Sequence, residues 1–450
     1  MTDISSLKAS FIIPGQAPSA AGTGRWRARL HGLLLFGFLL FTFVGTRPFA
    51  EADAATRTDG NVLDRIAVLG LFGLSLLVLW LHRWRVARFA LPALPVFVLV
   101  GFAMASIVWS DFPDLTLRRS LLLFFLAVIA FAVAIGTENL RQLHTWMFAT
   151  MTAIILINLA GCVIVPSIAI SEIGVRGMYS QKNVAGIVAL ITMILGTTWV
   201  LGSATRRETV IGMTALVPTA FFLVITISKT SINLAALGIV VILFFGMIER
   251  HGRSFILFAI AVGLLLAVGI TLWLATLEFD INAAMTTLIG DTSFTGRDEL
   301  WAFARNAAEK RYWLGHGYGA FWDVGTANDP LIRAEVGSWL AAVQIGVINQ
   351  AHHGYLELWL HLGLPATVLA TVITIWAALY GGLHACFGLA KPATRAALGA
   401  FAVLLLLYLA HNLTEATLFM RGASFNSTAL LATFLIARAR DFAFQDLAQP

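Results

Sequence analysis

The segment 350–365 gathers groups that can move protons, at the point where a long polar region ends and a long apolar one begins. His352 and His353 are adjacent, and Tyr355 and Glu357 follow within the next helical turn. Ionisable groups at the edge of hydrocarbon are costly, so their presence indicates function. A neutral imidazole is a competent general base for a hydroxyl group, and we expect that chemistry here. The alternative is a pair of interfacial polar residues; two histidines without further ligand spacing predict no metal site.

Two cations lie near the expected starts of helices. Arg297 opens an amphipathic helix that Thr295 is predicted to cap, and Lys229 lies in the short polar break 228–231 between two apolar runs. Backbone N–H groups and the helix dipole favour an anion at a helix start, and a guanidinium adds bidentate recognition of phosphate. Both residues are therefore candidate phosphate ligands. The alternatives are a surface ion pair between Arg297 and Glu299, and a Lys229 ammonium that reaches the membrane interface.

Further polar residues are expected on the same side of the membrane. They are Arg118, Arg119, Arg176, Asn183, His411 and Glu415. The two adjacent arginines open an apolar run on the side that otherwise has few basic residues in its short loops, which favours a functional role over a topological one. The glycines of 315–319 predict a tight turn, because no strand and no second part of a nucleotide-binding motif accompanies them.

The composition indicates that these residues belong to a membrane protein, whose helices must position them. Of 450 residues, 59% are hydrophobic and 12% are charged, which is not the composition of a water-soluble domain. Runs of about 17–25 apolar residues, long enough to cross a bilayer, recur along the chain. The predicted spans are 30–49, 62–81, 91–109, 118–136, 143–165, 183–202, 209–227, 230–248, 254–276, 354–382, 396–411 and 423–438. We predict an all-α polytopic membrane protein with about twelve transmembrane helices, one long loop and no nucleic-acid-binding surface.

The distribution of basic residues predicts the orientation. Arginines concentrate in alternate loops, which places those loops and both termini in the cytoplasm, with the candidate site on the opposite side. The expected division is a disordered tail (1–24), nine spans (25–276), a periplasmic loop with amphipathic helices (277–353), three spans (354–438) and a cytoplasmic tail (439–450). The first apolar run could instead be a signal peptide cleaved near 50–52.

The order of the motifs along about residues 100–425 resembles the O-antigen ligase and polysaccharide polymerase superfamily of bacterial inner-membrane proteins. The exopolysaccharide polymerase branch is the most similar. The motifs are Trp109-Ser110-x-x-Pro113 leading into Arg118-Arg119, Gly177-Met178-Tyr179-Ser180-Gln181-Lys182-Asn183, Ser228-Lys229-Thr230, Gly296-Arg297-x-x-x-Trp301, the segment from His352 to Leu362-Gly363-Leu364-Pro365, and His411-Asn412-x-x-Glu415.

This resemblance implies an inverting glycosyltransferase of the multi-spanning GT-C-like class, which uses undecaprenyl-pyrophosphate-linked oligosaccharide without ATP or another cofactor. The sequence shows no acidic cluster for magnesium on that side, so we expect charge stabilisation of the pyrophosphate without metal. The residues expected to supply it are Arg297 and Lys229, with Arg118, Arg119 and Arg176. His352 matches the family histidine that acts on the acceptor, and Lys229 and Arg297 match two positions that contact the pyrophosphate. The sequence departs from the family pattern at three places: His353 replaces asparagine, His361 replaces an acidic residue, and Lys229 replaces the arginine of the ligase branch.

The function implied is polymerisation of lipid-linked repeat units into exopolysaccharide on the periplasmic face of the bacterial inner membrane. A sugar acceptor, the lipid bilayer and a chain-length-control protein are the expected partners. Within the same chemistry, a ligase would transfer the glycan to lipid A core or another acceptor. A transporter or lipid flippase is the alternative from another class, but it predicts ionisable residues near the middle of spans rather than at one side.

Overall fold

The computed structural model describes residues 21–49, 61–276 and 297–448. Long helices dominate it: α2 (Ala21–Phe43), α4 (Val62–Leu81), α5 (Arg83–Ala105), α6 (Pro113–Gly136), α7 (Leu140–Ile164), α9 (Lys182–Leu201), α10 (Arg206–Ile225), α11 (Lys229–His251), α12 (Arg253–Thr276), α14 (Arg297–Lys310), α16 (Gly354–Phe387), α17 (Pro392–His411), α18 (Ser424–Ala437) and α19 (Ala439–Ala448). Short elements connect them: η1 (Ser106–Val108), α8 (Pro166–Ala169), the antiparallel pair β1 (Ile170–Ser171) and β2 (Gly174–Val175), η2 (Thr326–Asn328), η3 (Pro330–Arg333) and α15 (Trp339–Ala342).

The all-α polytopic membrane fold is confirmed. Among the described residues, nine helices are long and apolar enough to cross a membrane. The remaining predicted spans overlap with α2, α12 and α18, so every predicted apolar run contains helical residues. The boundaries differ most at α2, which begins at Ala21 and ends at Phe43, and at α5, which begins at Arg83. The helix α16 continues to Phe387 and bends where Gly363 takes a φ of 81°.

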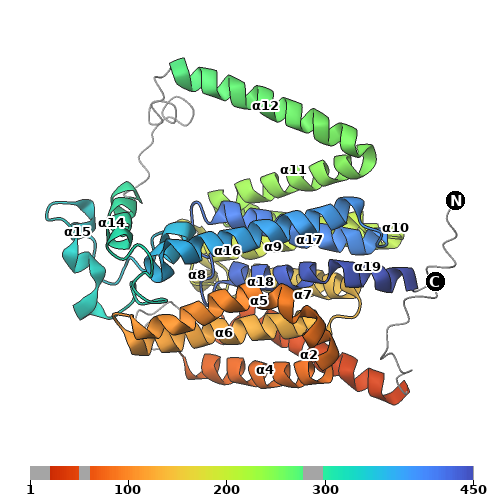
Figure 1. Ribbon diagram of the computed structural model, residues 1–450, viewed down its shortest axis with the longest axis horizontal. Coiled ribbons are helices and arrows are strands. Elements are labelled where there is room, and N and C mark those ends of the chain that lie inside the picture. The colour runs from red at the N-terminus through yellow and green to blue at the C-terminus, as the bar shows by residue number, and fades with distance from the viewer. Residues whose placement is uncertain (1–20, 50–60, 277–296, 449–450) are drawn as a thin grey trace.

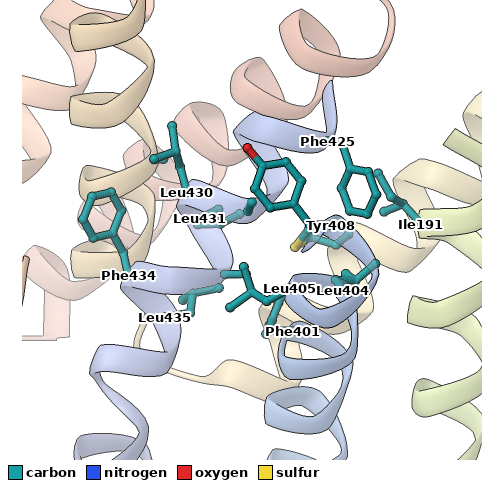
Figure 2. Close-up of a cluster of buried hydrophobic side chains, with 14 of the residues drawn as sticks. Ile191, Phe401, Leu404, Leu405, Tyr408, Phe425, Leu430, Leu431, Phe434 and Leu435 are labelled. Carbon is teal, nitrogen blue, oxygen red and sulfur yellow. The ribbon is translucent and has the colours of Figure 1, made fainter. Parts of the chain in front are cut away.

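The core lies among α6, α9, α17 and α18. Figure 1 shows most of the long helices running roughly along the long axis of the molecule, with α14 across it and α12 set apart beyond α11. Of the nine candidate spans, α6, α9 and α17 are the most enclosed. Figure 2 shows side chains of α17 and α18 packed against each other, with Phe401, Leu405 and Tyr408 facing Leu431 and Leu435. This packed centre gives the loops at its ends a rigid base.

The two ends of the bundle differ in character. At one end, which we call the loop end, lie residues 106–112, 165–181, 226–228, 311–353 and 412–423, together with α14 and α15 (Figure 1). At the opposite end, the buried Arg438 guanidinium donates to carbonyl oxygens at the end of α6, among them that of Thr137 at 2.7 Å, and pairs with Asp441 at 2.8 Å. The predicted C-terminal tail begins there as α19, and it packs against α16, α17 and α18.

Some predictions fall outside the described residues. These are the N-terminal tail up to residue 20, the cleavage site at 50–52, the cap at Thr295 and the first part of the long loop, 277–296. The predicted amphipathic helix after Thr295 is present as α14, and it buries Leu300, Ala304 and Ala308.

Candidate active site

Several helices begin at one place at the loop end. The first residues of α9, α11, α14 and α16 lie near the connection between α17 and α18. A helix start presents unpaired backbone N–H groups, so this convergence creates a region that favours negative charge. The candidate residues are spread over more than 200 positions of sequence, and this arrangement brings part of them together.

His352 and Glu415 form the centre of the site. The Nδ1 atom of His352 lies 3.2 Å from Oε2 of Glu415, and the side chains are 30% and 8% exposed. The carboxylate accepts the hydrogen bond, so Nδ1 carries a hydrogen, and in the neutral ring the lone pair is on Nε2. His352 has a φ of 50°, which is uncommon for a residue other than glycine and typical of functional positions. The imidazole is therefore oriented and open to solvent on one side.

The other oxygen of Glu415 faces two donors. Oε1 accepts a hydrogen bond from Nδ2 of Asn183 at 2.9 Å and lies 3.9 Å from Nη2 of Arg297. Nη1 of Arg297 donates to the Thr414 carbonyl at 3.2 Å. Burial alone would raise the pKa of Glu415, but the hydrogen bond from His352 and the charges of His352, His411 and Arg297 lower it overall. Glu415 is thus a buried carboxylate, ionised at neutral pH.

The start of α16 is fixed next to an aromatic cluster. His353 is the N-cap of α16, and its Nδ1 accepts from the Leu356 N–H at 3.2 Å. Its ring meets those of Trp301 and Tyr355 edge-on, with centroids 5.6 and 5.8 Å away, and burial lowers its pKa. Trp301 also donates from Nε1 to the carbonyl of Ala351 at 2.9 Å. These contacts hold the chain on both sides of His352.

Glu357 lies behind this segment, apart from the group that His352, Asn183 and Arg297 form around Glu415. It is only 3% exposed, and its Oε2 accepts from the Ala351 N–H at 2.7 Å and from Nε1 of Trp322 at 3.1 Å. His361 approaches Oε1 to 3.3 Å. All of these partners are protein groups, so the geometry favours a supporting role for Glu357.

Arg119 is separated from the group around Glu415. It is buried, and its guanidinium donates to the carbonyl oxygens of Gly319, Trp322 and Asp323. Arg118, by contrast, is exposed, so the two adjacent arginines lie in different environments although the sequence suggested a shared role. Arg119 fixes the turn 319–323, and that turn presents Trp322 to Glu357.

The remaining candidates are distributed around the site. Lys229 is the exposed first residue of α11, next to Ser228, whose hydroxyl lies 3.3 Å from Oδ1 of Asn183. His411 is buried at the end of α17, with Nδ1 3.2 Å from the Thr417 hydroxyl. Arg176 is half-buried in the connection before α9, where its Nε donates to the Ile168 carbonyl at 2.6 Å. Of these three, His411 is electrostatically coupled to Glu415.

Sequence reasoning missed the roles of several residues. Ser228 was visible only as part of a polar break, and Trp322 lay in a loop without periodicity. Gly354 permits a contact that no pattern indicates: a Cβ there would clash with the Asn412 side chain, and the Gly354 N–H donates to the Asn412 carbonyl at 2.8 Å. The position of Gly354 immediately after two histidines was the one available signal.

No cluster of three His, Cys, Asp or Glu side chains that could hold a metal ion occurs in the part of the chain that the structure describes. The site instead combines a histidine and a buried carboxylate with Arg297 beside them and Lys229 at a neighbouring helix start. This arrangement can orient an imidazole toward a hydroxyl group and present positive charge to an anion.

Part of the chain matches a known family. Residues 214–371 match the O-antigen ligase family. The match includes Lys229, Arg297 and His352, whereas Asn183 and Glu415 lie outside it. No curated protein matches the chain. The family match confirms the resemblance of this chain to the O-antigen ligase and polysaccharide polymerase superfamily.

Proposed function

We propose that the protein is an inverting glycosyltransferase that joins undecaprenyl-pyrophosphate-linked oligosaccharide repeat units into exopolysaccharide. The observation that carries the proposal is the convergence of His352, Glu415 and Arg297, from three separate segments, at one end of a membrane-spanning bundle. The family match supports transfer of a lipid-linked glycan.

In the proposed reaction, Nε2 of His352 removes the proton from the attacking sugar hydroxyl. The hydroxyl oxygen forms a bond to the anomeric carbon of the donor, and the bond from that carbon to the pyrophosphate oxygen breaks. The proton remains on the imidazole, and Glu415, 3.2 Å from Nδ1, stabilises the resulting imidazolium. A single displacement of this kind inverts the anomeric configuration.

The leaving group needs positive charge rather than a proton, because a pyrophosphate oxygen departs as a stable anion. Arg297 and Lys229, each the first residue of its helix, are the cations we assign to it. At each helix start, unpaired backbone N–H groups add further hydrogen-bond donors for the phosphate. Charge grows on the phosphate as the glycosidic bond breaks, so these contacts strengthen in the transition state. In this account the two side chains carry out the charge stabilisation, without added metal or ATP.

The other predicted site residues receive supporting roles in the proposal. Arg119 uses its guanidinium on backbone carbonyls, and we assign it to holding the turn 319–323. Glu357 holds Ala351, the residue before the base. Arg118 and Arg176 lie outside the group formed by His352, Glu415 and Arg297, and we keep them as candidates for contact with the donor phosphate.

Ligation is the second candidate, and the description of the matched family as O-antigen ligase favours it. It uses the same donor and the same chemistry, and only the acceptor differs. The protein in lipid nanodiscs should be given labelled undecaprenyl-pyrophosphate oligosaccharide, alone or with lipid A core. A ladder of lengthening glycans from donor alone supports polymerisation, and a single product on lipid A core supports ligation. No glycan transfer to either acceptor would contradict the proposed function.

A further inference from the structure

A chain of hydrogen bonds leads away from the candidate base toward the start of α11. Nδ2 of Asn183 donates to Oε1 of Glu415 at 2.9 Å, and Oδ1 of Asn183 accepts from the hydroxyl of Ser228 at 3.3 Å. The Ser228 hydroxyl also lies 3.1 Å from that of Ser231. Ser228 and Ser231 are each 1% exposed, so this part of the chain is shielded from solvent.

The packing of α9 against α11 makes these contacts possible. Gly186 lies one helical turn after Asn183, and a Cβ at that position would come within 2.6 Å of Oγ of Ser231 and 2.7 Å of Cβ of Ser228. A larger residue would therefore push the two helix starts apart. The absence of a side chain at Gly186 brings Ser228 within reach of the Asn183 amide.

We propose that Asn183, held by Ser228, is a positioning residue that keeps Glu415 bonded to His352 and keeps Arg297 available for the donor. The inference rests on the proposed function, because it assigns a task within that reaction.

Asn183 and Arg297 compete for Oε1 of Glu415, and this competition is the physical reason for the positioning role. A guanidinium and a carboxylate favour a bidentate pair, in which both carboxylate oxygens face the arginine. Such a pair would turn Oε2 away from His352 and would occupy the cation needed for pyrophosphate. With the Asn183 amide on Oε1, Arg297 stays 3.9 Å away, beyond hydrogen-bond distance.

Asn183→Ala should therefore lower kcat by about tenfold to a hundredfold, the cost of losing a hydrogen bond to a charged group. The KM for the donor should rise, because Arg297 becomes free to pair with Glu415. Ser228→Ala should change both constants in the same directions by a smaller factor, since it leaves the amide in place. Thr192→Ala is the matched control, because it removes a buried hydroxyl of α9 that bonds only within its own helix, to Val188.

Asn183→Asp gives a readout that a purely structural role would not change. The new carboxylate lies beside Glu415 and adds negative charge near His352, which favours the imidazolium. The acidic limb of the rate–pH profile should therefore move to higher pH. The other charged or titratable groups that act on Glu415 are Arg297 and His411, and they are unchanged in the variant.

These outcomes separate the inference from the proposed function. A shifted acidic limb for Asn183→Asp, with an unshifted profile for Thr192→Ala, supports the positioning role. If the parent protein transfers glycan and every Asn183 variant lowers the rate equally at all pH values, Asn183 serves only folding and the inference is wrong. If the parent protein itself transfers no glycan, the proposed function is wrong.

Discussion

The imidazole of His352 and the carboxylate of Glu415 are hydrogen-bonded although 63 positions separate them in the sequence. His352 precedes α16, and Glu415 follows α17, so the antiparallel packing of these two helices brings the pair together. In the proposed reaction, Glu415 is the carboxylate that orients the general base His352. The other oxygen of Glu415 lies 3.9 Å from Nη2 of Arg297.

Glu415→Gln should reduce the rate of glycan transfer strongly while the protein still inserts and folds. The glutamine can still hydrogen-bond to Nδ1 but no longer stabilises the imidazolium, so much of the general-base contribution of about 10²–10⁴ should be lost. Steady-state transfer rates in nanodiscs measure this, with Glu335→Gln, an exposed residue of the same loop end, as control. Parental activity in Glu415→Gln would show that the carboxylate has no part in the reaction.

The same substitution should have a pH-dependent effect on stability. The pKa of Glu415 is lower in the folded protein than its ordinary value, so the carboxylate stabilises the fold above that value. This contribution is lost as the pH falls through the lowered pKa. The difference in thermal unfolding between parent and Glu415→Gln should therefore shrink on acidification below the usual range of a glutamate. A difference that grows toward acid pH would show that the pKa shift has the wrong sign.

Arg297→Ala should reduce the chemical rate by about 10²–10³, corresponding to about 2.7–4 kcal/mol of transition-state stabilisation. Arg297→Lys should restore only part of it, because the bidentate geometry is lost. Lys229→Arg should be mild, since a guanidinium keeps the charge. Single-turnover rates with and without a chelator measure these effects. Near-parental rates for Arg297→Ala, or loss of parental activity on chelation, would mean that a metal ion holds the pyrophosphate.

Glu357→Ala should destabilise the protein and lower activity, whereas Glu357→Gln should retain most of both. Alanine leaves the N–H groups of Ala351 and Trp322 without an acceptor, at about 1–3 kcal/mol each. Glutamine can place its oxygen toward them and its amide toward His361. Thermal unfolding and transfer rates together test this. Equal inactivity of both variants, with the fold intact, would give Glu357 a role in proton transfer.

Much of the fold could be predicted from the sequence, because the length of an apolar run depends only on local composition. The runs that became α4 and α6 are examples. The separation of α12 from the bundle was not accessible, since an apolar run does not show which helices it contacts. The bend at Gly363 depends on its surroundings in the same way, because a Cβ there would clash with the backbone of Trp313.

The candidate site was predictable as a set of residues but not as a geometry. The positions of His352, Arg297 and Glu415 stood out because polar groups are rare beside apolar runs. Their mutual contacts depend on helix packing over long sequence separations, which one sequence does not contain. Arg119 illustrates the limit: its unusual place was recognised, but its bonds to Trp322 and Asp323 follow from a turn that has no pattern.

The arrangement of arginines predicts that the loop end faces the periplasm. A reporter active only in the cytoplasm should give no signal when inserted within 325–335 and a clear signal when fused after Arg440. Both fusions need a matched measurement of protein level. A cytoplasmic signal from the 325–335 insertion would reverse the orientation and place the site on the wrong side for the proposed reaction.

The most direct test of the account is glycan transfer by purified His352→Ala in nanodiscs, with labelled undecaprenyl-pyrophosphate oligosaccharide as donor. His353→Asn, which restores the commoner family residue, is the matched control. We predict that His352→Ala folds and binds donor but transfers no glycan above background, while His353→Asn remains active. Transfer at the parental rate by folded His352→Ala would contradict the assignment of this histidine as the general base.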